Sequence, residues 1–412
     1  MMQAHVCSPG GAASRRLPLN PWRGLAGLPR ALWVLAGATL VNRSGTMFLP
    51  FLILYLTKDM GVTPSVAGGV FALFGIGALV AGPFAGRLAD RFGPVRMMRI
   101  SLVLSGVLLL LVPLARTLPS IAGLTLLLAL AGEAFRPSSL SVISHLAAPD
   151  QRKAAFALQR LAVNLGMSVG PAVGGFLAAV SWPALFLADG ATSLLAAATL
   201  VLLFPRDVSF PSPRPAGAAP SRREGLRDPT LVYFLVALVP VGIVFFQHES
   251  SMSVYLVRDL GMAVWTFGLL HTVNTLLIVF LEVPLNLAMA HWPHRRALVL
   301  GSVLVGVGFG ALAFARSLPA VVLTIVVWTF GEMVLLPGMS SWVADVSPPE
   351  SRGVYMGLYT MAFNLAIVVG PPLGTSLLEH GGGRVLWPAM LALGLVSAAL
   401  FSRVKEPRRE AA

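Results

Sequence analysis

The chain contains two copies of one sequence pattern, offset by 200 positions along its 412 residues. The matching positions carry polar or backbone-shaping residue types, which an apolar composition alone would not bring into register. They include Tyr55 and Tyr255, Asp59 and Asp259, Arg116 and Arg316, Pro137 and Pro337, Asn164 and Asn364, and Gly170 and Gly370. Each copy is long enough to be a domain rather than a solenoid unit. The chain is therefore predicted to consist of two homologous halves.

Composition places both halves in a lipid bilayer. Hydrophobic residues make up 56% of the chain and charged residues only 11%, far below the roughly 25% charged residues of soluble domains. A helix needs about 20 apolar residues to cross a bilayer, and each half divides into six such stretches. They run over 31–56, 64–86, 97–115, 119–145, 153–180 and 184–204, and over 230–257, 264–290, 297–315, 320–345, 353–378 and 385–402.

The predicted fold is an all-α polytopic membrane protein with 12 transmembrane helices in two pseudo-symmetric six-helix bundles. The segment between the bundles is rich in Pro, Ser and Arg, a composition typical of linkers. The predicted parts are an N-terminal tail (1–30), a first bundle (31–204), a linker (205–229), a second bundle (230–402) and a C-terminal tail (403–412).

Lys and Arg are distributed unevenly between alternate loops. They are concentrated in both tails, in the linker and in the loops near 87–99 and 295–296. The opposite loops carry few, namely Lys58, Arg116, Arg258, Arg316 and Arg384. Because positive loops stay in the cytoplasm, the sequence predicts a multi-pass protein of the inner (plasma) membrane with both termini cytoplasmic. The net charge of +13 is then a topology signal that also attracts anionic lipid, and no nucleic-acid partner is expected.

A first motif is predicted to form the cytoplasmic loop between the second and third helices. It reads Gly86-Arg87-Leu88-Ala89-Asp90-Arg91-Phe92-Gly93, followed by Arg96. Gly86 allows close approach of another helix, and a carboxylate such as Asp90 is favourable at a helix N-terminus. Positive-inside charges alone explain the arginines but not Gly86, Asp90 and Gly93 together.

A second motif lies on the helix predicted over 153–180. It consists of Gly166, Gly170, Pro171, Gly174 and Gly175. Glycines four residues apart expose one smooth stripe for close helix contact, and the proline removes a backbone donor. Gly370, Pro371 and Gly374 form a reduced copy in the second half. Generic small-residue packing is the simpler alternative for the glycines alone.

These motifs, together with Pro50, resemble the major facilitator superfamily and, within it, the twelve-helix drug:proton antiporters. The resemblance covers nearly the whole chain from about residue 30. It implies that Asp90 latches the cytoplasmic side shut by capping the helix that starts near Ser347-Pro348-Pro349-Glu350. The family's arginine on the fourth helix is absent, and Thr125 takes its place. Any proton mechanism must therefore use other residues.

Ionisable side chains at bilayer depth are costly, so each one is a candidate for function. A satisfied buried histidine is the simpler alternative for His271. The family fold places the sixth helix outside the cavity, so Asp189 is expected to be structural or near the surface. The candidates for the proton or substrate pathway are Arg43, Glu133, Arg136, His248, Glu249, His271, Glu282 and Glu332, and Arg160 also lies at bilayer depth.

Within this set, Glu133 is predicted to carry the proton. Arg43 lies at a similar estimated depth, and an approaching guanidinium would favour release of the proton from a nearby carboxyl group. The alternative for Glu133 and Glu332, which each follow a glycine and precede a proline, is that they satisfy backbone groups opened by that proline. Glu249 and Glu282 are the reserve candidates. Glu282 also shares a helical stripe with His271, Asn274 and Ile278. The family resemblance implies that this helix lines the central cavity, so the stripe is expected to face substrate.

Other function classes fit the sequence less well. His248-Glu249 is not followed by the second histidine of a zinc-protease helix, and no Gly-x-x-x-x-Gly-Lys-Ser/Thr phosphate loop is present. We expect no enzymatic activity, metal or cofactor, and a monomeric protein. The favoured function is proton-coupled efflux of lipophilic or cationic small molecules. The alternatives are uptake or facilitated diffusion of a polar metabolite, and a non-transporting membrane sensor or assembly protein.

Overall fold

The computed structural model describes residues 27–148, 151–205, 222–289, 291–348 and 351–406, together with Leu25 and Val208. All regular elements within these residues are helices, as expected where lipid leaves no external partner for backbone groups. The first half comprises α1 (Arg30–Ser44), α2 (Phe48–Lys58), α3 (Pro64–Phe92), α4 (Pro94–Leu111), η2 (Val112–Leu114), α5 (Leu118–Gly132), α6 (Phe135–Leu146), α7 (Arg152–Val180) and α8 (Trp182–Leu202).

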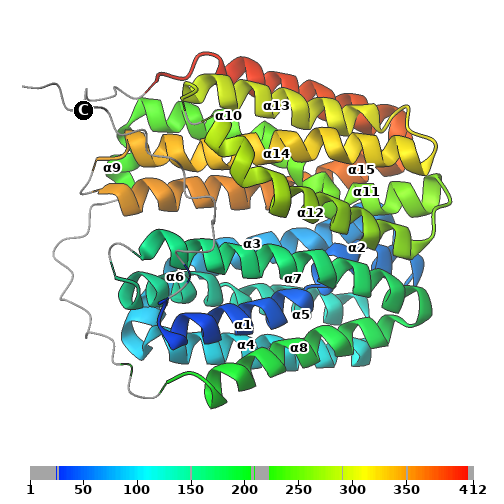
Figure 1. The fold of residues 1–412 in the computed structure, drawn as a ribbon. Coiled ribbons are helices and arrows are strands. Elements are labelled where there is room, and N and C mark those ends of the chain that lie inside the picture. Colours follow the sequence, from blue (N-terminus) through cyan, green and yellow to red (C-terminus); the bar gives the residue numbers. More distant parts are fainter. Residues whose placement is uncertain are drawn as a thin grey trace, which may run out of the picture.

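The second half follows a short helix, α9 (Arg222–Arg227). It comprises α10 (Pro229–Phe245), η3 (Phe246–Glu249), α11 (Ser251–Val254), η4 (Tyr255–Asp259), α12 (Val264–Ala288), α13 (His294–Ala311), α14 (Leu318–Val346) and α15 (Arg352–Phe401). Figure 1 shows the first half as one layer of roughly parallel helices and the second half as another layer stacked on it.

The number of membrane crossings agrees with the sequence. Ten helical stretches of the described residues are long and apolar enough to cross a membrane. One of them, α15, holds two crossings because Gly382 (φ 64°, ψ −173°) breaks its helical backbone with a positive φ that favours glycine. α13 packs against α14 and α15 and supplies one more. The second crossing of α15 and the crossing formed by α13 bring the ten stretches to twelve crossings. This confirms the predicted twelve-helix, all-α polytopic fold.

Several crossings are interrupted rather than continuous. The first crossing breaks between α1 and α2, and the fourth breaks between α5 and α6. In the second half, Ser250 (φ −125°, ψ −96°) separates η3 from α11, and η4 is a π-helix. Discontinuous helices of this kind expose backbone groups inside the membrane, which is tolerated where protein or a cavity satisfies them. In transporters they mark binding sites.

The two halves meet through two pairs of long helices, α7 with α12 and α3 with α15. We call the end of the bundles near α9 the linker end and the opposite end the distal end. The closest backbone approaches between the halves lie toward the distal end. There, the Ser65 backbone N–H donates to Glu379 Oε2 at 2.7 Å, and Thr272 Oγ1 donates to the Ser168 carbonyl at 2.7 Å.

Glycines make these approaches possible. A Cβ on Gly68 of α3 would lie 2.1 Å from Thr375 Oγ1 and 2.9 Å from the Pro371 carbonyl oxygen of α15. A Cβ on Gly268 of α12 would lie 2.1 Å from the Pro171 carbonyl oxygen of α7. These distances are shorter than a carbon–oxygen contact allows, so the two approaches require glycine.

Candidate functional site

The first crossing breaks where a buried carboxylate holds it. Asp189 of α8 accepts hydrogen bonds from the backbone N–H groups of Met47 (3.0 Å) and Phe48 (2.8 Å) at the start of α2. These groups have no partner within their own helix, and a negative charge at a helix N-terminus is favourable. The geometry supports the structural role expected for Asp189.

We predict that removal of this carboxylate destabilises the protein. Asp189→Ala leaves two buried backbone donors unpaired, and each such group costs about 1–3 kcal/mol. Asp189→Asn keeps one acceptor oxygen and should lower the melting temperature by less than Asp189→Ala does. Thermal unfolding of the purified variants in detergent measures the difference. An Asp189→Ala protein that melts with the wild type would refute this structural role.

The glycine motif of α7 contacts helices in both halves. A Cβ on Gly166 would lie 2.4 Å from Arg43 Cβ, and one on Gly170 would lie 2.9 Å from the Arg43 carbonyl oxygen. Gly174 faces Met47 and Phe51 in the same way. On its other face, Gly175 lies against Trp265 of α12. One face of the motif therefore receives the break between α1 and α2, and the other forms the contact between the halves.

The reduced copy on α15 repeats this two-sided arrangement. A Cβ on Gly370 would lie 3.2 Å from the Ile243 carbonyl oxygen of α10 in the same half. Gly374 faces Gln247 of η3, while Pro371 and Thr375 contact Gly68 of the other half. The pseudo-symmetry seen in the sequence thus extends to the interface that joins the halves.

Arg43, Glu133 and Arg136 come together in the first half. Arg43 lies in the last turn of α1 and interacts electrostatically with Glu133, Arg136 and Asp189. Its Nε atom is buried without a hydrogen-bond partner among the described residues. Glu133 occupies the break between α5 and α6, where Pro137 has no N–H to donate to the Glu133 carbonyl. We call Arg43, Glu133 and Arg136 the first-half cluster.

A second cluster lies on η3, α12 and α14. Asn274 Nδ2 donates to Glu332 Oε2 at 2.9 Å and to Thr329 Oγ1 at 3.0 Å. His248 Nε2 lies 3.6 Å from Glu249 Oε1, and its ring centroid is 5.6 Å from that of His271. Glu249 and Glu332 interact electrostatically. The second-half cluster comprises His248, Glu249, His271, Asn274, Glu282, Thr329 and Glu332.

His271 differs from a histidine that serves packing alone. It is 6% exposed, and its ring interacts with the Phe267 backbone one turn earlier, although neither ring nitrogen makes a hydrogen bond of standard geometry among the described residues. Buried polar groups are normally hydrogen-bonded, so His271 keeps at least one ring nitrogen that can bind a proton or a substrate group. His271, Asn274 and Glu282 are all buried on the predicted stripe of α12.

An ion pair crosses from one half to the other. Arg160 of α7 donates to Glu282 of α12, and the Glu282 side chain is 7% exposed while that of Arg160 is 56% exposed. Both line a cavity of about 430 Å³ toward the linker end, which also includes Asn286, Trp292 and Pro337. The sequence identified both charges, but the pairing was missed because helical periodicity gives the face of each helix and not its neighbour.

Two further polar residues were missed. Gln247 Nε2 donates to the carbonyls of Ile243 (2.8 Å) and Gly370 (3.0 Å), and its Oε1 accepts from Ser251. Tyr359 of α15 interacts electrostatically with Arg136 across the halves. A glutamine within an apolar stretch was the available signal for Gln247, whereas nothing in the sequence pattern connects Tyr359 with Arg136.

The motif at the linker end lies mostly on a helix, not in a loop as predicted. Gly86, Asp90 and Arg91 belong to α3, which continues to Phe92 because neither proline nor glycine interrupts it after Gly86. Gly93 (φ 87°) makes the turn into α4, which starts at Pro94. The Arg91 guanidinium lies 5.5 Å from the Phe92 ring centroid, and Arg96 is exposed. The Asp90 side chain and residues 349–350 lie outside the described residues, so the latch stays a prediction.

Among the described residues, no hydrogen bond, ion pair or electrostatic interaction links Glu133 with Glu249, Glu282 or Glu332. The structure therefore separates the predicted pathway residues into one cluster for each half. Arg160 and Glu282 connect the halves, as does the interaction of Tyr359 with Arg136.

Comparisons with known proteins agree with this architecture. The model of the Major Facilitator Superfamily matches residues 34–265 and 249–412. The chain is 24% identical over 377 residues to a Na(+), Li(+), K(+)/H(+) antiporter of Planococcus maritimus, covering 82% of this chain and 87% of that one. It is 24% identical over 372 residues to multidrug resistance protein MdtH of Aeromonas salmonicida (strain A449), covering 88% and 92%.

The fold is also found among solved structures. A bacterial homologue of the human lysosomal transporter Spinster, in an inward-facing and unoccupied conformation, superposes with a TM-score of 0.71 at 18% identity, over 90% of this chain and 95% of that one. The family model matches nearly the whole chain. Membership of this family explains the repeat, the helices and the interface between the halves. The chain belongs to the Major Facilitator Superfamily and is a multi-pass membrane transporter of small-molecule substrates.

Proposed function

We propose that this transporter exports lipophilic or cationic small molecules in exchange for protons. The observation that carries the proposal is the arrangement of three acids within the membrane. Glu133, Glu249 and Glu282 each lie beside a basic side chain, respectively Arg43, His248 and Arg160. A carboxylate in the membrane can be neutralised by a bound proton or by a cationic substrate. When the neighbouring basic side chain moves, the carboxylate can therefore exchange one for the other.

The names of the relatives support the same reaction class. One relative is described as an antiporter of monovalent cations and protons, and another as a multidrug resistance protein. Sparse polar side chains outside the two clusters favour an amphipathic substrate that is recognised by shape as well as by charge.

We assign the transported proton to Glu133. Its carboxyl group lies at a helix break and interacts with both Arg43 and Arg136. Arg43 itself lies beside the break between α1 and α2, packed on the glycine stripe of α7. When the halves rock, a small displacement of Arg43 would change the charge balance at Glu133 and drive proton uptake or release. The reserve candidates are Glu249 and Glu282.

The cycle would alternate between closure at the distal end and closure at the linker end. The contacts at Gly68 and Gly268 hold the distal end together. With both termini in the cytoplasm, this arrangement corresponds to the inward-facing state. Asp90 would stabilise the opposite state by capping the helix that begins at Arg352. Rigid-body rocking about a site near the membrane midplane is the mode that this repeat architecture supports.

Expression in an efflux-deficient bacterial host tests the substrate class. The transporter should raise tolerance to several unrelated lipophilic cations, and a protonophore should abolish the effect. Movement of a single sugar or amino acid, with no change in drug tolerance, would favour uptake or facilitated diffusion of a polar metabolite instead.

The ion pair between the halves gives a separate prediction. Arg160→Glu or Glu282→Arg alone places like charges at one contact and should reduce substrate exchange by about fivefold, since Arg160 is 56% exposed and a solvent-screened pair contributes up to about 1 kcal/mol. The double variant restores opposite charges and should recover much of the exchange. A double-mutant cycle on counterflow rates measures the coupling. A double variant no better than the worse single variant would exclude a functional pair.

A further inference from the structure

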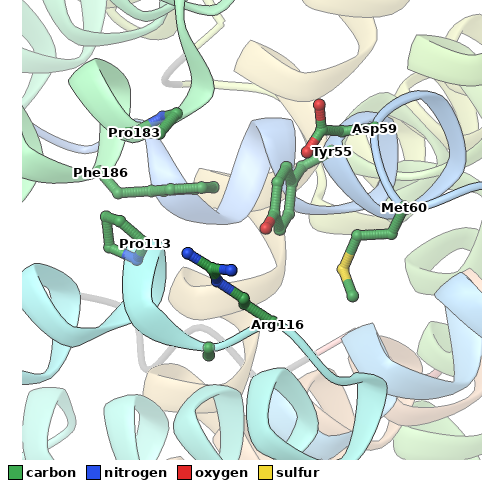
Figure 2. A pocket seen from close by; sticks show the side chains of 8 residues that line it. Tyr55, Asp59, Met60, Pro113, Arg116, Pro183 and Phe186 are labelled. Carbon is green, nitrogen blue, oxygen red and sulfur yellow. The ribbon is translucent and has the colours of Figure 1, made fainter.

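A second pocket opens at the distal end of the first half. Its volume is about 360 Å³, within the roughly 300–1,000 Å³ range of small-molecule sites. It contains no residue of the first-half or second-half cluster. Figure 2 shows its lining, which comes from the end of α2, the connection between η2 and α5, and the start of α8: Tyr55, Asp59, Met60, Pro113, Ala115, Arg116, Pro183 and Phe186.

Three polar side chains line this pocket. Tyr55 is 8% exposed, and Figure 2 shows the Arg116 guanidinium turned toward Tyr55 and Phe186. The Tyr55 hydroxyl, the Arg116 guanidinium and the Asp59 carboxylate make no hydrogen bond within the described part of the chain. The Tyr55 ring is buried while its hydroxyl faces the pocket, so the hydroxyl and the Arg116 guanidinium are both free to hydrogen-bond an occupant.

The second half provides an internal comparison, because Tyr255 and Arg316 are the repeat partners of Tyr55 and Arg116. There, Arg316 Nη1 donates to the Tyr255 hydroxyl at 3.0 Å, and that hydroxyl donates to the Leu312 carbonyl at 3.1 Å. Trp387, which is fully buried, packs edge-on against Tyr255 with ring centroids 5.1 Å apart. The equivalent polar groups are thus satisfied within the protein.

The first half keeps the equivalent tryptophan, Trp182, but within the described residues it lacks the hydrogen bond between the arginine and the tyrosine. Trp182-Pro183-Ala184 corresponds to Trp387-Pro388-Ala389, but Trp182 is only partly buried whereas Trp387 is fully buried. The walls are nevertheless built, since the Tyr55 ring packs against Phe186 (4.9 Å) and Trp182 (5.6 Å between centroids). An aromatic wall beside unpaired polar groups is typical of a binding site. In the second half, the equivalent arginine and tyrosine are hydrogen-bonded to each other instead.

Charge and location identify the chemistry of a ligand. The pocket carries one guanidinium and one carboxylate, so a zwitterion suits it better than an ion of either sign. Guanidinium and phenol donors match a phosphate oxygen, and the carboxylate matches an ammonium group. Trp182 and Tyr55 are residue types of the membrane–water interface. Next to the pocket in sequence, Leu114 is 72% exposed and Val180 87% exposed, as expected beside acyl chains.

We infer that this pocket binds a phosphate ester that carries an ammonium group, the chemistry of a phosphatidylethanolamine head group in the leaflet at the distal end. Arg116 and the Tyr55 hydroxyl hold the phosphate, and Asp59 holds the ammonium. The site joins α2, the loop before α5 and α8, so its occupant links the moving first crossing to the rest of the first half.

Lipid titration of the purified full-length protein, followed by native mass spectrometry, tests the inference. The probes are dihexanoyl phosphatidylethanolamine, dihexanoyl phosphatidylglycerol and soluble phosphoethanolamine. Arg116→Gln and Tyr55→Phe should each weaken phosphatidylethanolamine binding, by about tenfold or more for the loss of the charged hydrogen bond. The matched control Arg316→Gln should not, and melting temperatures verify that each variant is folded.

Asp59→Asn distinguishes a zwitterion site from an anion site, because it should shift the preference toward phosphatidylglycerol. Phosphoethanolamine that binds as tightly as the lipid would identify a soluble zwitterion as the occupant, and binding of the lipid alone would identify a head group. Equal phosphatidylethanolamine affinity of the wild type, Arg116→Gln and Tyr55→Phe would overturn the inference, as would tighter binding of phosphatidylglycerol to the wild type.

Discussion

Gly68→Val should force the distal end of the transporter open. A Cβ at this position would lie 2.1 Å from Thr375 Oγ1, 2.9 Å from the Pro371 carbonyl oxygen and 3.1 Å from Pro372 Cα. The last two are backbone atoms, which cannot rotate away as a side chain can. An overpacking cost of about 1–3 kcal/mol corresponds to roughly a 5- to 150-fold loss of the closed state.

The neighbouring glycine provides a matched control. Gly69 lies on the same helix, and a Cβ there would meet no atom within 4 Å among the described residues, so Gly69→Val should leave the closed state intact. Spin labels at the exposed positions Lys58 and Arg258, after Cys7→Ser, report the distance between the halves at the distal end. Double electron–electron resonance should give longer distances for Gly68→Val only. Identical distributions for the two variants would show that the glycine contact does not hold the halves together.

Glu133→Gln should abolish transport driven by a pH gradient while exchange of substrate across the membrane continues. Glutamine keeps the size and polarity of the side chain but can neither bind nor release a proton. Exchange needs no net proton movement, so the rocking of the halves and the substrate site remain usable. This expectation rests on the electrostatic interaction of Glu133 with Arg43 and on its position at a helix break.

The same assay on the reserve acids gives the comparison. Proteoliposomes of Glu133→Gln, Glu249→Gln and Glu282→Gln should differ: only the acid that carries the proton loses gradient-driven flux and retains exchange. Full gradient-driven activity in Glu133→Gln would move the assignment to whichever reserve variant shows that pattern. Loss of both activities in every variant would indicate substrate binding rather than proton transfer.

The helices and the repeat were predictable because they depend on hydropathy over long stretches and on residue types that recur 200 positions apart. Apolar stretches of bilayer length and polar positions such as Tyr55 and Tyr255 in register are properties of the whole chain. The spacing of Gly166, Gly170 and Gly174 also identified one packing face, and the structure places α1 and α2 on it.

The breaks and the pairings were not predictable in the same way. The break at Ser250 has no glycine or proline at that residue, and the break before α2 depends on Asp189, which is 142 positions from Met47. Arg160 and Glu282 are 122 positions apart and lie in different halves. Periodicity assigns each side chain to a face of its own helix, but tertiary packing decides which faces meet.

Proton-coupled antiport is tested most directly by reconstituting the purified protein into liposomes that contain a pH-sensitive dye and a lipophilic cationic substrate. An imposed pH gradient should move the substrate against its concentration, and an imposed substrate gradient should move protons in the opposite direction, since coupling is reciprocal. Substrate movement that neither responds to the pH gradient nor changes the internal pH would contradict the proposed function.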